Sequence, residues 1–158
     1  MDVISIKDFP GIRIGNAQNV EGGTGCTVIL SESGMCAGLD VRGGGPASRE
    51  SELLKPLASA QTIHAVLLGG GSAFGLDAGG GVMQFLEEKD IGFDVGVTKV
   101  PLVCQSDLFD LTVADPHCRP DKAMGYEACM LILTITRMET SVWAQEQPSV
   151  NLRGWISV

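Results

Sequence analysis

The sequence predicts an α+β fold in which helices pack on a partly antiparallel sheet. Short apolar runs between glycine-rich turns predict strands, whereas other segments place apolar side chains at helical spacing. The two kinds of segment do not alternate strictly, as a wholly parallel sheet would require. A chain of 158 residues is long enough for one domain with a substantial core.

The first predicted element is a β-hairpin. Residues 24–30 (TGCTVIL) and 35–41 (MCAGLDV) are apolar runs, and the turn-rich tetrapeptide SESG separates them. Cys26 and Cys36 lie within these runs, so we expect both to be small core residues.

A short helix is expected after the glycine-rich loop RGGGPAS. Ser48 is a suitable N-cap for a helix that carries Leu53, Leu54 and Leu57. Pro56 lies inside this pattern, and it predicts that the helix is short or kinked.

A buried central strand is predicted at residues 63–68 (IHAVLL), and it leads into a helix that Ser72 should cap. The apolar face of this helix comprises Phe74, Ala78, Val82, Phe85 and Leu86. Gly79, Gly80 and Gly81 lie in the middle of the predicted helix. Because a glycine there costs about 1 kcal/mol relative to alanine, we expect these three to allow close backbone packing.

Two further elements complete the predicted fold. Residues 100–103 (VPLV) are expected to form a short strand. Residues 119–129 (RPDKAMGYEAC) should form a helix, with Pro120 near its first position and Asp121 in its first turn.

Composition excludes several classes of function. The net charge of −8 argues against a nucleic-acid partner, which needs clustered Lys and Arg. Neither a membrane-spanning run nor a signal-peptide pattern is present, so we expect a cytoplasmic protein without a membrane partner. The five cysteines form no CxxC pair and have no histidine at metal-ligand spacing, and we expect free thiols and no metal.

The strand–GGGS–helix junction at residues 69–72 is the most obvious candidate site. Backbone N–H groups at a helix start can hold an anion or a developing oxyanion. Phe74 nevertheless breaks both the dinucleotide pattern GxGxxG and the nucleophile elbow GxSxG, and GxxxxGK is absent. Tight strand-to-helix packing is therefore the favoured interpretation, and a ligand loop is the alternative.

Four other polar residues have weaker signals. His64 lies inside an apolar strand and is expected to be a hydrogen-bonded core residue, whereas His117 lies in a turn and should be exposed. Arg42 precedes three glycines and is suited either to binding a carboxylate or to a surface ion pair. Asp77 is on the predicted helix and can equally face solvent.

Seven blocks of the chain, in order, resemble the first half of the L-aminopeptidase/D-esterase (DmpA-like) family. They are PGIRIGNAQN, TGCTVIL, AGLDVRGGGPASRESELL, HAVLLGGGSAFGLDAGGGVMQFLEE, GFDVGVTKVPLV, LFDL and RPDKAMGYEAC. The resemblance covers roughly residues 9 to 129. After VPLV, where the family usually continues with proline and small apolar residues, this chain has CQSD.

The resemblance implies an αββα sandwich similar to that of N-terminal-nucleophile hydrolases. It also implies a precursor that cuts itself, so that a new N-terminal Ser or Thr is the nucleophile and its α-amine the base. Members remove N-terminal residues from short peptides, amides or esters, need no metal or other cofactor, and form homo-oligomers. A cut before Ser72 would sever the central strand from its helix and is not expected.

The family's nucleophile and its oxyanion-hole Asn lie downstream, so we expect this chain to contain no catalytic residue and to be inactive alone. The substrate-binding residues that we expect from it are Arg42, Gly43, Gly70, Gly71, Ser72 and Phe109. Two alternatives remain open. One is a small-ligand or anion-binding module that uses Gly69–Ser72, and the other is a structural fragment that associates with a separate second half.

The tail differs in character from the body, because it holds both tryptophans and only one of the 21 glycines. The family has a motif similar to GNVGAGTGATVGK here, whereas this chain has RMETSVWAQEQPSVNLRGWISV. In a shifted reading frame, each new codon joins the third base of one codon to the first two bases of the next. In this frame Met138–Glu139 and Trp143–Ala144 must each give glycine. At every other position the genetic code allows a codon choice that gives the string NGNVGVGTGATVGKLKGMDIC. We therefore expect residues 1–129 to be the N-terminal part of such a peptidase domain and residues 130–158 to be an out-of-frame tail. A divergent native C-terminus is the alternative.

Overall fold

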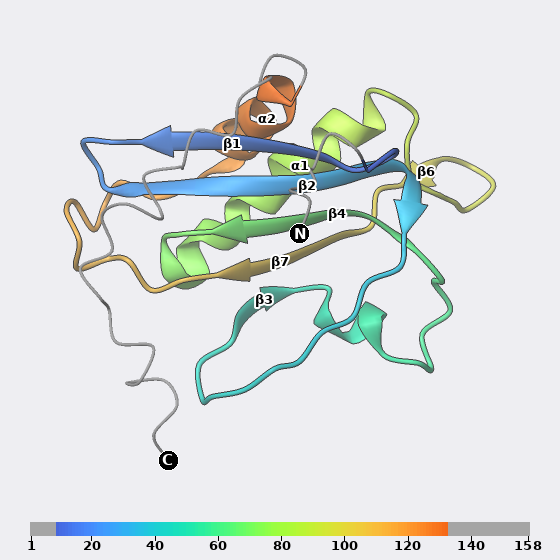
Figure 1. Ribbon diagram of the computed structural model, residues 1–158, viewed down its shortest axis with the longest axis horizontal. Helices are drawn as coiled ribbons and strands as arrows, with labels where there is room; N and C mark the ends of the chain where they lie inside the picture. The colour runs from blue at the N-terminus through green and yellow to red at the C-terminus, as the bar shows by residue number, and fades with distance from the viewer. Residues whose placement is uncertain (1–8, 133–158) are drawn as a thin grey trace, which may run out of the picture.

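The computed structural model describes residues 9–132, which form a five-stranded sheet with two α-helices on one of its faces (Figure 1). The strand order is β1-β2-β4-β7-β3, and only the β4–β7 pair is parallel. The strands of this sheet are β1 (Arg13–Asn19), β2 (Thr24–Met35), β3 (Ala47–Arg49), β4 (Ile63–Gly69) and β7 (Val103–Asp107). The predicted α+β class with a partly antiparallel sheet is confirmed.

The remaining elements are two short 3₁₀ helices, a two-stranded hairpin and the two α-helices. They are η2 (Ser51–Leu54), η3 (Ser72–Asp77), α1 (Ala78–Glu87), the β5–β6 hairpin (Phe93–Asp94 and Lys99–Val100) and α2 (Lys122–Leu131). Neither α-helix, nor any other helix within residues 9–132, has the length and apolar character that crossing a lipid bilayer requires.

The core lies between the sheet and the two α-helices. Buried side chains of β2 and β4, such as Val28 and Leu67, face Val82 and Leu86 of α1. Successive strand residues point to opposite faces, so the register separates this inner face from a second one. We call that second face the outer face: across four strands in register it carries the row Ile14, Ile29, Val66 and Cys104.

Residues 24–30 form a strand as predicted, but they do not form the predicted hairpin with residues 35–41. β2 does not turn at SESG but continues to Met35, and it pairs with β1 on one side and β4 on the other. The SESG segment is absorbed as an irregularity between Leu30 and Met35, where Gly34 has a φ of +83°. The chain then leaves the sheet, and Cys36 is exposed rather than in the core as predicted.

The predicted helix after Ser48 is only a four-residue 3₁₀ turn. Ser48 lies in the edge strand β3, and the N-cap of η2 is Glu50, which adopts a left-handed conformation and makes no side-chain capping bond. The turn ends before Pro56, as the proline predicted. Leu57 does not belong to a helical face, because it is 99 % exposed.

The central strand is confirmed as β4, but the helix after it starts differently from the prediction. Ser72 makes no capping bond; the N-cap is Gly71, and a 3₁₀ turn precedes α1. The three glycines therefore lie in the first turn of α1 instead of its middle. The extra turn also changes the helical phase, so that Phe74 is 60 % exposed while the other four predicted face residues are buried.

Close packing is confirmed for Gly79 and Gly81 but not for Gly80. A β-carbon on Gly81 would overlap the carbonyl oxygen of Lys122 in α2, and one on Gly125 of α2 would overlap the carbonyl oxygen of Ala78. A β-carbon on Gly79 would lie 2.5 Å from Gln105 Oε1, which is closer than an ordinary contact. A β-carbon on Gly80 would lie 3.9 Å from its nearest neighbours, two side-chain carbons of Lys122, which is an ordinary contact distance.

The last two elements differ slightly from their predicted bounds. Pro101 and Leu102 interrupt the predicted strand, and β7 runs on through the CQSD segment. α2 exists as predicted, but Asp121 is its N-cap, since its side chain accepts a hydrogen bond from Met124 N at 2.9 Å, and Pro120 precedes the helix. Of the proposed out-of-frame tail, Met130 and Leu131 complete α2 and Ile132 is its C-cap, whereas residues 133–158 lie outside the described residues.

Candidate functional site

Backbone hydrogen bonds hold the glycine-rich junction between β4 and η3 against two neighbouring segments. Gly70 N donates to Gly25 O at 3.0 Å, and Ser72 N donates to Leu108 O at 2.8 Å. Leu108 N in turn donates to Gly69 O at 2.8 Å. The loop after β7 is therefore bonded to the junction at two points.

Asp110 is the side chain that secures this turn. Its Oδ1 accepts from Gly71 N at 2.6 Å, and its Oδ2 accepts from Thr24 Oγ1 at 2.7 Å, with both side chains buried. Gly70 must be glycine, because a β-carbon there would overlap Asp110 Oδ2. The N–H groups of Gly70, Gly71 and Ser72 thus all donate within the chain, so an anion would have to displace these bonds to use them.

A second carboxylate, Asp107, lies beside the junction at the end of β7. Gln105 Nε2 donates to both oxygens of Asp107 at 3.0 Å and to Gly75 O at 2.8 Å. Burial raises the pKa of Asp107 to about 6, the nearby Asp110 carboxylate adds to the rise, and the Gln105 hydrogen bond partly opposes it. Within residues 9–132, neither carboxylate has an ion pair with Lys or Arg.

Apolar and cationic groups lie on the solvent side of the same junction. The guanidinium carbon of Arg119 is 3.9 Å from the centroid of the exposed Phe74 ring. Leu108 and Phe109 are each about half exposed. The arrangement combines one buried carboxylate, Asp110, and one partly buried carboxylate, Asp107, with an accessible aromatic and cationic pair at the same glycine turn.

The structure brings together four of the six predicted substrate-binding residues. Gly70, Gly71 and Ser72 form the junction, and Phe109 lies between Leu108 and Asp110, which both bond to it. Arg42 and Gly43 lie instead in the exposed loop between β2 and β3, where Arg42 pairs with Asp40 at 2.6 Å. That pair is the surface ion pair that the sequence offered as one of two interpretations.

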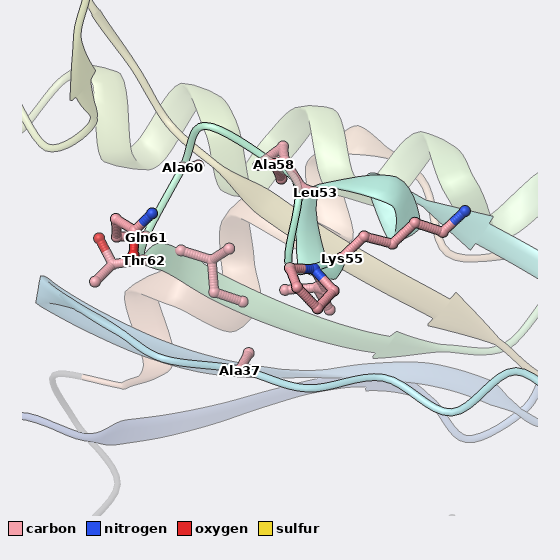
Figure 2. A pocket seen from close by; sticks show the side chains of 10 residues that line it. Ala37, Leu53, Lys55, Ala58, Ala60, Gln61 and Thr62 are labelled. Atoms are coloured by element: carbon pink, nitrogen blue, oxygen red, sulfur yellow. The ribbon is translucent and has the colours of Figure 1, made fainter.

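A cavity of about 160 Å³ lies at the other end of β4, near Ile63 (Figure 2). Its walls come from the segment 53–62, from Ala37 and from Ile63 itself. It contains none of the predicted substrate-binding residues. The junction, and not this cavity, therefore remains the candidate site.

The two histidines lie as predicted. His64 is 7 % exposed, its Nδ1 accepts from Leu102 N at 3.2 Å, and burial lowers its pKa. His117 is exposed in a turn. Within the described part of the chain, no three His, Cys, Asp or Glu side chains are placed to hold a metal ion.

The buried cysteines have the character of core residues. Burial raises the pKa of Cys26 to about 12, and it does the same for Cys129. Both thiols therefore stay protonated at neutral pH and are poor nucleophiles.

Sequence reasoning missed the side chains that hold the junction, namely Thr24, Gln105, Asp107, Asp110 and Arg119. All five lie in segments already noted in the sequence: Thr24 in TGCTVIL, Gln105 and Asp107 in CQSD, Asp110 in LFDL and Arg119 in RPDKAMGYEAC. These segments did not show which side chains meet, since Thr24 and Asp110, for example, are 86 positions apart.

Residues 5–128 match the profile of peptidase family S58. An uncharacterized aminopeptidase of Mycobacterium leprae is 43 % identical over 133 residues, which cover 79 % of this chain and 37 % of that protein. One from Mycobacterium tuberculosis is 43 % identical over 135 residues, covering 79 % of this chain and 39 % of the relative. A 6-aminohexanoate-oligomer endohydrolase of Kocuria sp. is 34 % identical over 121 residues, covering 77 % and 32 %. The matched part of this chain thus spans less than two fifths of these relatives' length.

Proposed function

Because this chain belongs to peptidase family S58, we propose that it is the N-terminal part of a self-processing aminopeptidase. The complete enzyme removes N-terminal residues from short peptides, amides or esters through an N-terminal Ser or Thr, and it works as a homo-oligomer in the cytoplasm. The observation that carries the proposal is the match of residues 5–128, with 43 % identity to uncharacterized aminopeptidases.

The chain alone is inactive under this proposal. The segment that supplies the nucleophile and the oxyanion-hole Asn belongs to a second half, and covalent catalysis needs both groups. The short coverage of the relatives, 37 % and 39 %, supports this assignment. So does the geometry of Ser72, whose N–H bonds to Leu108 O inside a continuous strand-to-helix connection.

The outer face of the sheet is where the second half packs. Its row of apolar side chains is in register across the strands, and Leu68, on the same face of β4, is 43 % exposed. Both described α-helices cover the opposite face (Figure 1). A second sheet on the outer face completes the sandwich, which agrees with a fragment that associates with a separately supplied half.

Residues 130–158 are an out-of-frame translation under the same proposal. Two observations support it: the family match ends at residue 128, and the shifted reading of the tail permits the glycine-rich motif of the family. The direct check is the DNA sequence between the codons for Tyr126 and Met138. If no single insertion or deletion there reconnects the tail to the motif, the tail is native.

An expression experiment tests the function. The chain as it stands and a frame-restored gene with its downstream half are purified and assayed on amino-acid p-nitroanilides and dipeptides. The restored precursor should run as two bands on a denaturing gel and release N-terminal residues, whereas the chain alone should not. Turnover by the purified chain that Ser72→Ala abolishes would contradict the proposal and favour an internal cut.

A further inference from the structure

Within the described part of the chain, the guanidinium of Arg119 makes no hydrogen bond or ion pair, and it lies at the candidate site. Its guanidinium lies over the face of Phe74, with Cζ 3.9 Å from the ring centroid. This contact is with the ring and not with a hydrogen-bond acceptor, and the five N–H donors of the guanidinium make no hydrogen bond within residues 9–132. Phe74 is 60 % exposed, which leaves the pair accessible from solvent.

This arginine has no acidic partner within residues 9–132, where no carboxylate lies within 4.0 Å of it. Acidic groups are not scarce, because the chain has 19 Asp and Glu against 11 Lys and Arg. Arg13 and Arg42 both form ion pairs, with Glu32 and Asp40. The guanidinium of Arg119 is thus kept on the aromatic ring with its donors available.

The backbone around Arg119 holds the side chain in place. Its Cβ would lie 3.1 Å from a β-carbon on Gly71, so the residue sits directly against the glycine turn. Pro120, which follows, is fully buried and leads into the N-cap of α2. A donor group fixed in this way loses little conformational entropy when it binds a ligand.

Apolar surface also lies at the same glycine turn. Leu108, 47 % exposed, is tied to the turn through the hydrogen bond from Ser72 N. A planar cation beside aliphatic and aromatic surface suits a carboxylate that has an apolar group next to it. A polyanion suits it less, since the net charge of −8 repels multiply charged ligands.

We infer that Arg119, held over Phe74, binds the C-terminal carboxylate of a short peptide substrate whose neighbouring side chain lies against Leu108. The inference rests on the proposed aminopeptidase function, and among the proposed substrates it predicts a preference for short peptides with a free carboxylate over amides and esters. It assigns Arg119 to substrate selection rather than to the chemical step.

Binding is tested first on this chain, where no catalysis is involved. The ¹⁵N-labelled protein is titrated with N-acetyl-leucine and, separately, with N-acetyl-leucinamide, both in the millimolar range. The acid should shift the Arg119 Nε–H and the amides of residues 72–74, and the amide should not. Arg119→Gln should remove the response, whereas Arg13→Gln, which changes the charge equally, should keep it. Equal shifts with both compounds, or none with the acid, would overturn the inference.

Selectivity is tested on the frame-restored enzyme with a dipeptide and its C-terminal amide. Arg119→Gln should lower kcat/KM for the free acid by about 10–100-fold, mainly through KM, and change the amide less than twofold. Arg119→Lys should fall between, because it keeps the charge but loses the planar fork. Equal losses on both substrates would show a structural role and refute the inference. A wild-type enzyme that cleaves acid and amide equally well would also refute it, while the aminopeptidase proposal would stand.

Discussion

At the scale of single residues, the glycine turn is held by two carboxylates that have no counter-charge in the described part of the chain. Asp110 accepts hydrogen bonds from Gly71 N and Thr24 Oγ1. Asp107 accepts from the Gln105 amide, and burial, the largest cause, raises the pKa of its carboxyl group to about 6. Asp107 therefore makes the stability of the fold depend on pH.

Asp107→Asn should make the fold more stable at neutral pH. The pKa of Asp107 is about 6 in the folded state against an ordinary 3.8, so the folded form holds its proton more tightly than the unfolded form. The stability from this group is fully present below pH 3.8 and is lost as pH rises through 6. At pH 7.5 the asparagine variant should therefore melt about 2–4 °C above the wild type, and at pH 4 the two should agree.

The measurement is a series of circular-dichroism melts between pH 4 and pH 8. Glu21→Gln, which removes an exposed carboxylate, serves as the control for the change in net charge. A difference between Asp107→Asn and wild type that is the same at every pH would contradict this assignment.

At the scale of elements, the contact between α1 and α2 depends on glycines of both helices. Gly81 meets the backbone of Lys122 and Tyr126, and Gly125 meets that of Ala78. Backbone atoms cannot rotate away as a side chain can, so the two helices stay in close contact only while these positions lack a β-carbon.

Gly81→Ala should destabilise the fold by about 1–3 kcal/mol, because the added methyl overlaps the Lys122 carbonyl oxygen. Gly80→Ala is the matched control, because its β-carbon would lie 3.9 Å from the nearest atoms. Alanine is also more favourable than glycine in a helix by up to about 1 kcal/mol. Urea unfolding of both variants measures the difference. If Gly81→Ala proves as stable as Gly80→Ala, the helices are free to separate and the packing argument is wrong.

Elements whose pattern lies within one segment could be predicted, and those that depend on distant partners could not. The uninterrupted apolar run of residues 63–68 was sufficient to place β4 at the centre of the sheet. β1, with the sequence RIGNAQN, has no such run, and Gly15 is buried only because α2 packs on it. In the site, the glycine junction could be predicted from the sequence. The side chains that bond to it could not, because residues that meet there, such as Gly71 and Asp110, are 39 positions apart.

At the scale of the whole molecule, helices cover one face of the sheet (Figure 1), and on the outer face Leu68 is 43 % exposed. Large apolar surface that stays accessible in a single chain commonly marks an interface. The family membership and the outer face together support the proposed sandwich, in which the proposed second half supplies the second layer.

Leu68→Lys should leave the isolated chain nearly unchanged but block maturation of the frame-restored precursor. In the chain alone, Leu68 is 43 % exposed, so the substitution should alter stability by no more than about 0.5 kcal/mol. In the precursor, the lysine would be buried between two sheets without a partner, which is costly. Val97→Lys, at a position 94 % exposed in the β5–β6 hairpin, is the control.

The readouts are the melting temperature of the chain and the appearance of two bands from the precursor. Normal self-cleavage and activity in the Leu68→Lys precursor would show that the second half does not cover the outer face.

The crossing of α1 and α2 also has a consequence for the gene. Every glycine codon has the form GGN, so any missense change at codon 81 or 125 adds at least one carbon atom where a carbonyl oxygen already lies. Only third-base changes leave these two positions intact. In a library that mutates every codon of residues 9–132 and is selected for folded protein, codons 81 and 125 should therefore keep only synonymous variants. Codon 80 should also keep variants that encode alanine.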